Sequence, residues 1–188
     1  MALNVVQVEE IAAVLREVPR LVDGLESRSA GFQEGVHKWL KKAESVLESN
    51  RLPAVSQVAS CRAQLYQASR GQEIPGISFS GRPTPRKIAE ATAAMVLQRC
   101  DQILHDAIAE RMTVYQEAER IARQLVTVAE AKGMLAQCAG APGAGGTVSC
   151  LQQKLKSDPD LAGLYTHLAA LVGKNDVPVF LDRALPGS

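Results

Sequence analysis

The clearest structural signal lies near the start of the chain, in VEEIAAVLREVPRLVDGLESRSAGFQEGVHKWLKKAESV, residues 8–46. Side chains at alternating spacings of three and four residues are apolar here, except for Ser29. This spacing keeps one stripe on one side of a helix, and over more than about five heptads it favours helices that pack lengthwise. Pro19 lacks an N–H, so it should bend this segment or split it into two helices in line. The stripe comprises Val8, Ile11, Leu15, Val18, Val22, Leu25, Ser29, Phe32, Val36, Trp39, Ala43 and Val46.

A second stretch, residues 84–137, predicts the longest helix. Thr84 is suited to cap it, and Pro85 to its first position. The same spacing recurs along it, with one slip between Val114 and Ala118. The predicted stripe comprises Ala89, Ala93, Val96, Cys100, Ile103, Ala107, Glu110, Val114, Ala118, Ile121, Leu125 and Val128.

The composition favours helices packed on helices. Aromatic residues make up 4% of the chain, and Ala and Leu, both strong helix formers, supply much of the apolar mass. We therefore predict an all-α fold, an elongated antiparallel helical bundle or coiled coil with two long helices plus shorter C-terminal helices. Residues 1–137 would form the long-helix domain. Residues 138–188 would add a glycine-rich hinge, short helices and an extended C-terminal arm packed on it.

The charge is nearly balanced, with 21 basic and 20 acidic side chains and a net charge of +1. No global field therefore steers the protein toward nucleic acid or anionic membranes. No run approaches the roughly 18 apolar residues that a membrane span needs, and the first ten residues lack signal-peptide features. We expect a cytoplasmic protein without a membrane span.

Two segments outside the long helices are unusually apolar. Residues 71–83 should form a loop that either packs against the bundle or binds another chain, and basic side chains follow it. The C-terminal arm needs a surface to lie on. The predicted partner-binding residues are Ile74, Ile77, Phe79, Arg82, Arg86, Lys87, Val177, Val179, Phe180 and Leu181.

The four cysteines form two pairs of different character. Cys61 and Cys100 fall at apolar helix positions and are predicted to be small buried hydrophobic residues. Cys138 and Cys150 bracket the glycine-rich segment and could form a disulfide if the protein were exported. A reducing cytosol would favour free thiols, so the sequence leaves this pairing open.

No motif identifies a catalytic, cofactor or metal site. Gly140–Thr147 approaches the phosphate-binding loop G-x-x-x-x-G-K-[ST], but Gly146 replaces the lysine and a helix is expected before it, so a hinge is the better interpretation. Glu34 and His37 match one Glu-x-x-His pair, whereas a di-iron bundle needs two pairs and two further glutamates.

These observations predict a non-enzymatic protein–protein interaction module, a scaffold, adaptor or complex subunit that self-associates. The alternative is a bundle that encloses a small apolar ligand or lipid, lined in part by Met95, Met112 and Met134. A third hypothesis is weak nucleic-acid binding through residues 82–87. Nucleic acid is the less expected partner because aromatic residues for base stacking are missing there.

Overall fold

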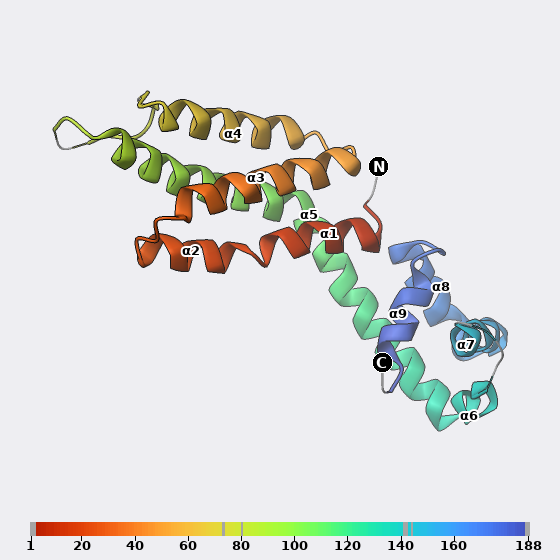
Figure 1. Cartoon of the computed structure of the whole chain (residues 1–188). Coiled ribbons are helices and arrows are strands. Elements are labelled where there is room, and N and C mark those ends of the chain that lie inside the picture. Colours follow the sequence, from red (N-terminus) through yellow and green to blue (C-terminus); the bar gives the residue numbers. More distant parts are fainter. Residues whose placement is uncertain (1–2, 73, 80, 141–142, 144, 187–188) are drawn as a thin grey trace. The chain divides into compact units, whose positions relative to one another are not determined.

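The structure, a computed structural model, describes residues 3–72, 74–79, 81–140, 143 and 145–186 (Figure 1). All regular structure in these residues is helical, which confirms the all-α prediction. No helix among them is long and apolar enough to cross a bilayer. The helices are α1 Val5–Leu15, α2 Val18–Glu26, α3 Phe32–Ser49, α4 Val55–Ser69, α5 Pro85–Ala131, α6 Met134–Cys138, α7 Gly146–Ser157, α8 Ala162–Val172 and α9 Val177–Ala184.

The chain packs into two compact units. The N-terminal unit is Val6–Ala109, and the C-terminal unit is Glu110–Ser188 together with Met1–Val5. The division falls inside α5, which begins in the N-terminal unit and ends in the C-terminal one.

In the N-terminal unit, α2 follows α1 in line, and each helix from α3 to α5 runs back along the one before it (Figure 1). Ile11, Leu40 and Leu47 are fully buried in its core. The indole N–H of Trp39 donates to the carbonyl of Val14 at 2.9 Å, which joins α3 to α1 inside the same core. Long-range contacts of this kind fix how the helices face one another.

The predicted first long helix is not formed. The chain breaks after Leu15 and then reverses direction between α2 and α3. Arg28 takes the left-handed conformation (φ 53°), and the N–H of Ser29 donates to the carbonyl of Gly24 at 2.9 Å. This pattern caps the end of a helix. Ser29 is therefore exposed in a connection, and the prediction of two long helices is wrong: α5, with 47 residues, is the one long helix described.

Helix α5 begins as predicted, because the N–H of Lys87 donates to Thr84 Oγ1 at 3.3 Å. In its middle, the buried side chains are Leu104, Ile108 and Tyr115. The predicted stripe residues there, Ile103, Ala107, Glu110 and Val114, are half-buried or exposed. From Cys100 to Ala118 the buried side chains of α5 are Cys100, Leu104, Ile108, Tyr115 and Ala118, so the buried stripe differs from the predicted one in this part of the helix.

Short helices and cross-links build the C-terminal unit. The carbonyl of Leu3 accepts hydrogen bonds from Arg111 Nε and from the Tyr115 hydroxyl, each at 2.9 Å. The ring of Phe180 meets that of Tyr115 edge-on, with centroids 5.3 Å apart. These contacts hold the start of the chain and α9 against α5.

A disulfide joins Cys138, at the end of α6, to Cys150 in α7, with the Cα atoms 5.7 Å apart. The pairing that the sequence left open is therefore formed, and the expectation of free thiols is wrong. Disulfides are typical of oxidising compartments, so the cytoplasmic location stays a prediction.

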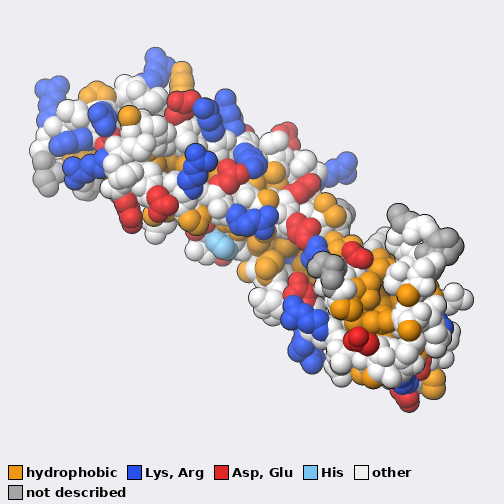
Figure 2. All heavy atoms as spheres, turned by 60° about the horizontal axis from the view of Figure 1, so that its bottom comes forward, with side chains coloured by type: hydrophobic (Ala, Val, Ile, Leu, Met, Phe, Trp, Pro, Cys, Tyr) orange, Lys and Arg blue, Asp and Glu red, His pale blue; other side chains and the backbone are white. Residues whose placement is uncertain are grey.

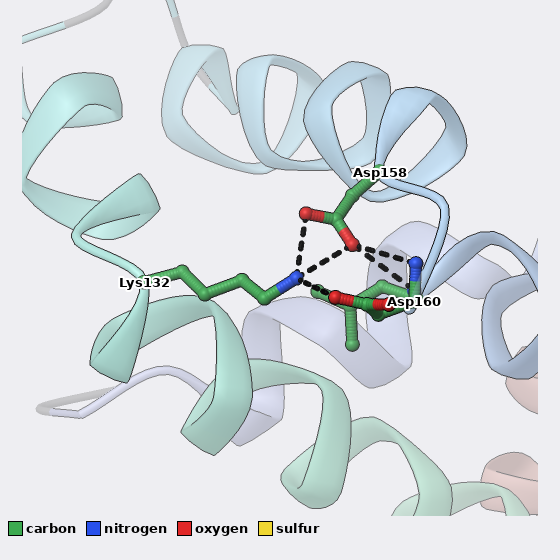
Figure 3. A network of polar contacts seen from close by, with 4 residues as sticks. Lys132, Asp158 and Asp160 are labelled. Atoms are coloured by element: carbon green, nitrogen blue, oxygen red, sulfur yellow. Dashed lines mark hydrogen bonds and ion pairs between the residues drawn. The ribbon is translucent and has the colours of Figure 1, made fainter.

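A polar network ties the end of α5 to the turn between α7 and α8 (Figure 3). Lys132 Nζ lies 2.8 Å from both carboxylate oxygens of Asp158 and 2.7 Å from Asp160 Oδ2. The hydrogen bond from Lys132 lowers the pKa of Asp158, and the two carboxylates raise the pKa of Lys132. Asp158 also accepts the N–H of Leu161 at 3.2 Å, in the turn that leads into α8.

Candidate protein-interaction surface

The apolar loop is folded onto its own unit. Ile74 is 3% exposed and forms one buried cluster with Ala68 and Ile88, against which Ile77 and Phe79 pack. Of the two alternatives that the sequence offered, the structure therefore shows the loop packed on the bundle. Ile77 and Phe79 stay half-buried.

The predicted basic residues lie at the start of α5 and in the loop before it. Arg82, Arg86 and Lys87 are all exposed. Arg86 Nε is paired with Glu90 Oε1 at 2.8 Å, one turn along the helix. An exposed pair of this kind contributes little to stability, but it reduces the positive charge that Arg86 can offer a phosphate.

The C-terminal residues do not form the predicted extended arm. They form α9, and Val177, Phe180 and Leu181 are buried, at 0%, 1% and 0% exposure. Pro178 sits in the first turn of this helix, where its missing N–H costs no hydrogen bond. Of the four predicted partner-binding residues in this segment, Val179 is the one that is half-buried and keeps some exposed surface. Figure 2 shows hydrophobic side chains gathered on part of the C-terminal unit.

Helix α2 buries its apolar side chains only in part. Val18, Val22 and Leu25 follow helical spacing, yet no residue of α2 is buried, and Val22 is 38% exposed. We call these three residues the α2 stripe. A helix of a folded domain normally covers its apolar face with its own core, so the α2 stripe is the unusual surface in the N-terminal unit.

A groove of about 660 Å³ lies between α2 and α3, here called the α2–α3 groove; the residues of the α2 stripe do not line it. Leu21, Phe32 and Trp39 supply its apolar part. Helix α3 presents Gly35 to it, and a Cβ at Gly35 would lie 3.1 Å from Leu21 Cδ2. The two helices approach so closely because this position lacks a side chain.

Charged side chains of both signs surround the α2–α3 groove. Lys42 pairs with Glu17, and Lys38 Nζ lies 2.6 Å from Glu34 Oε1. The hydrogen bond from Lys38 lowers the pKa of Glu34. Arg20 is exposed on α2 between these pairs. On the face drawn in Figure 2, acidic and basic side chains alternate over the N-terminal unit.

The structure gives less support to a metal site, a methionine-lined ligand cavity or a phosphate-binding loop. In the residues described, no three His, Cys, Asp or Glu side chains are grouped to hold a metal ion. Met95, Met112 and Met134 line none of the described pockets, and Met95 packs on the apolar loop cluster. Residues 141, 142 and 144 of the glycine-rich segment lie outside the described part, and α6 precedes the segment.

Comparison with known protein families, with curated proteins and with solved structures found no match. The α2–α3 groove was not predicted, because it exists only where the chain reverses between α2 and α3. Gly24, Gly31 and Gly35 gave the one available signal in the sequence, since glycines within an apolar repeat mark helix ends and close helix contacts.

Proposed function

We propose that this chain is a non-enzymatic interaction module that self-associates through the α2 stripe and the α2–α3 groove. The observation that carries the proposal is the incompletely buried apolar face of α2, in which Val22 is 38% exposed. An amphipathic helix beside an open groove is a common arrangement for helix-in-groove recognition. The proposal explains why α2 keeps apolar residues at helical spacing without burying them.

The charges around the groove favour a second copy of this chain as the occupant. In a two-fold dimer the same patch meets itself, so a self-complementary patch needs both signs of charge. Glu17 and Glu34 supply the acids, and Arg20, Lys38 and Lys42 supply the bases. A partner of one strong charge would be repelled either by the two acids or by the three bases, whereas a second copy can set acids against bases.

The apolar contacts would supply the affinity. Burying Val22 of both copies removes the exposed 38% of each side chain from water, which yields only a part of the about 1.5–3 kcal/mol gained when a whole apolar side chain moves from water into a core. The opposite charges at the rim mainly fix the register and speed the encounter. A dimer of moderate affinity is therefore expected, one that changes with protein concentration.

Light scattering coupled to size-exclusion chromatography, run over a range of protein concentrations, tests this proposal. The wild type should pass from monomer to dimer. Val22→Lys should raise the dissociation constant at least about tenfold, because it places a charge in the apolar contact. Val6→Lys is the matched control, since Val6 is a 57% exposed valine on α1, outside both the α2 stripe and the lining of the groove.

Arg20→Glu should also weaken the dimer, and added salt should weaken the wild type more than this variant. A wild type that stays monomeric at every concentration would contradict self-association. A dimer that Val22→Lys and Val6→Lys weaken equally, or not at all, would show that another surface is responsible.

A further inference from the structure

The loop between α4 and α5 brings apolar and basic side chains together at the surface. Ile77 and Phe79 are half-buried, and they pack on the cluster formed by Ala68, Ile74 and Ile88. Four basic side chains that flank these residues along the chain are all exposed, namely Arg70, Arg82, Arg86 and Lys87. We call these four residues, together with Ile77 and Phe79, the basic tip. None of them lines the α2–α3 groove.

The two ends of the loop lie side by side. Gly71 directly follows the cap of α4, and a Cβ at Gly71 would lie 3.5 Å from Cγ of Pro85, the first residue of α5. Arg70 precedes this contact and Arg86 follows it, so both arginines belong to the same end of the unit. Figure 2 shows basic side chains gathered at the end of the N-terminal unit that carries this loop. The basic tip is therefore one surface, although its members are spread along the sequence.

Most of the positive charge of the basic tip is unpaired. Residues 70–87 contain four basic residues and one acidic residue, Glu73, which lies outside the described part. Arg86 is paired with Glu90 at 2.8 Å, and among the described residues no carboxylate pairs with the other three basic side chains. Elsewhere in the unit, the basic residues that are paired with acids include Lys38, Lys42 and Arg62. The charge of the basic tip is thus available to a partner.

The start of α5 reinforces this positive charge. The N-terminus of a helix carries a partial positive charge, so acidic side chains are favoured in its first turn and basic ones are not. Helix α5 has no acidic residue in its first turn, and Arg86 and Lys87 lie there instead. Their repulsion from the helix terminus is offset when an anion approaches, which favours an anionic partner at this surface.

We propose that the basic tip binds the surface of an anionic lipid bilayer. The four basic side chains would lie among the lipid headgroups, and the exposed parts of Ile77 and Phe79 would reach the boundary with the acyl chains. Each Lys or Arg near an anionic membrane surface contributes about a fivefold gain in binding, so the three unpaired charges together give about 100-fold. The protein binds one face of the bilayer in this arrangement, and no helix has to cross it.

The apolar members of the basic tip favour a bilayer over a nucleic acid. Single-stranded nucleic acids are bound along basic grooves in which aromatic side chains stack on the bases. The basic tip has one aromatic residue, Phe79, and its side chain packs partly on the apolar cluster of the loop. A bilayer requires no stacking, only apolar side chains surrounded by basic ones. The net charge of the chain is only +1, but salt screens charges more than about 10 Å away at 0.1 M, so the local charge decides.

Cosedimentation of the full chain with sucrose-loaded vesicles tests the proposal. Vesicles of phosphatidylcholine alone are compared with vesicles of an equimolar mixture of phosphatidylcholine and phosphatidylserine. At low salt the wild type should bind the mixed vesicles at least about 100-fold more tightly than the neutral ones, and added salt should weaken this binding.

A matched pair of variants locates the binding surface. Arg82→Gln/Lys87→Gln should weaken binding to the mixed vesicles about 25-fold, because it removes two charges at about fivefold each. Lys41→Gln/Arg51→Gln is the control, since it removes the same charge from exposed residues of the same unit outside the basic tip. All four substitutions are at exposed positions, so each variant should fold like the wild type.

The depth of the loop separates a bilayer from other anions. In Phe79→Trp, brominated acyl chains should quench the new tryptophan, whereas Trp39 of the wild type is 2% exposed and should stay unquenched. Failure to bind the mixed vesicles would overturn the proposal, and binding of single-stranded RNA in that case would assign the basic tip to nucleic acid. Equal binding to both kinds of vesicle, an equal loss in the two double variants, or an unquenched Phe79→Trp would overturn it too.

Discussion

Each of the two units is stabilised internally in a different way. The N-terminal unit relies on apolar packing of helices of up to 18 residues besides its share of α5, with the Trp39 indole in its core. The C-terminal unit has helices of 5–12 residues after α5, and a disulfide and the Lys132 network connect them. Short helices are marginal alone, because nucleation costs as much as in a long helix while fewer hydrogen bonds repay it. The difference indicates that packing should dominate the stability of one unit and directed cross-links that of the other.

The largest effect is expected from Trp39→Ala. It removes a side chain that is 2% exposed, together with the hydrogen bond to Val14. We expect a loss of about 3–5 kcal/mol in the free energy of unfolding, measured by circular dichroism in denaturant. Tyr66→Ala is the control, because Tyr66 is 59% exposed and its removal should cost less than about 0.5 kcal/mol. If both variants lost the same free energy of unfolding, packing around Trp39 would not be what stabilises the N-terminal unit.

Cutting the disulfide should give the next largest effect. Cys138 and Cys150 are separated by 12 residues, and a loop of that length predicts a loss of about 3 kcal/mol in Cys138→Ser/Cys150→Ser. Trp39 is the single tryptophan of the chain, so fluorescence reports on the N-terminal unit and circular dichroism on both. We expect the dichroism transition to shift more than the fluorescence transition. Equal shifts would show that the two units unfold together, which would break the comparison.

The sequence was most informative where the apolar spacing matched a real helix. The α5 start at Thr84 and the buried positions of Trp39 and Cys100 followed from local rules. The reversal between α2 and α3 did not, because Arg28 occupies the left-handed position where glycine or asparagine is usual. A repeat that continues in phase across such a turn is indistinguishable in sequence from one continuous helix.

The candidate surfaces were less predictable than the fold. Ile74 and Phe180 were predicted to bind a partner because neither belongs to a predicted helical stripe. Long-range packing buries both of them. Val22 looked like a core residue because its spacing was right, yet nothing in its unit covers it completely. Burial depends on which segments meet in space, and spacing along one helix does not contain that information.

A smaller effect, this time a gain in stability, is expected at a buried polar residue in the packed N-terminal unit. Thr92 in α5 is 0% exposed, and its hydroxyl has no hydrogen-bond partner among the described residues. Thr92→Val keeps the shape and removes the unpaired hydroxyl, so it should stabilise the protein by about 1 kcal/mol or more in denaturant unfolding. Thr92→Ser, which keeps the hydroxyl and loses the methyl group, should destabilise it. A destabilised Thr92→Val would mean that the hydroxyl is hydrogen-bonded in solution.

The smallest effect concerns the Lys132 network and is best measured as a pH dependence. Because the folded protein lowers the pKa of Asp158, its contribution to stability is present above the unfolded pKa and is lost as the pH falls through the folded one. The raised pKa of Lys132 adds stability below the unfolded pKa of the lysine, which is lost as the pH rises through the folded value. Lys132→Met should therefore move the pKa of Asp158 upward and flatten both pH dependences.

Carboxyl NMR titration of Asp158 measures this shift directly. Lys154→Met is the matched control, since Lys154 on α7 bonds the neutral side chain of Gln137 at 2.6 Å. The backbone N–H groups of Asp160 and Leu161 also bond Asp158 Oδ1, so its pKa should stay somewhat low even in Lys132→Met. An Asp158 pKa that does not change in Lys132→Met would mean that water screens this exposed cross-link. In that case the disulfide would be the one cross-link that makes the stability of the C-terminal unit differ in origin from that of the N-terminal unit.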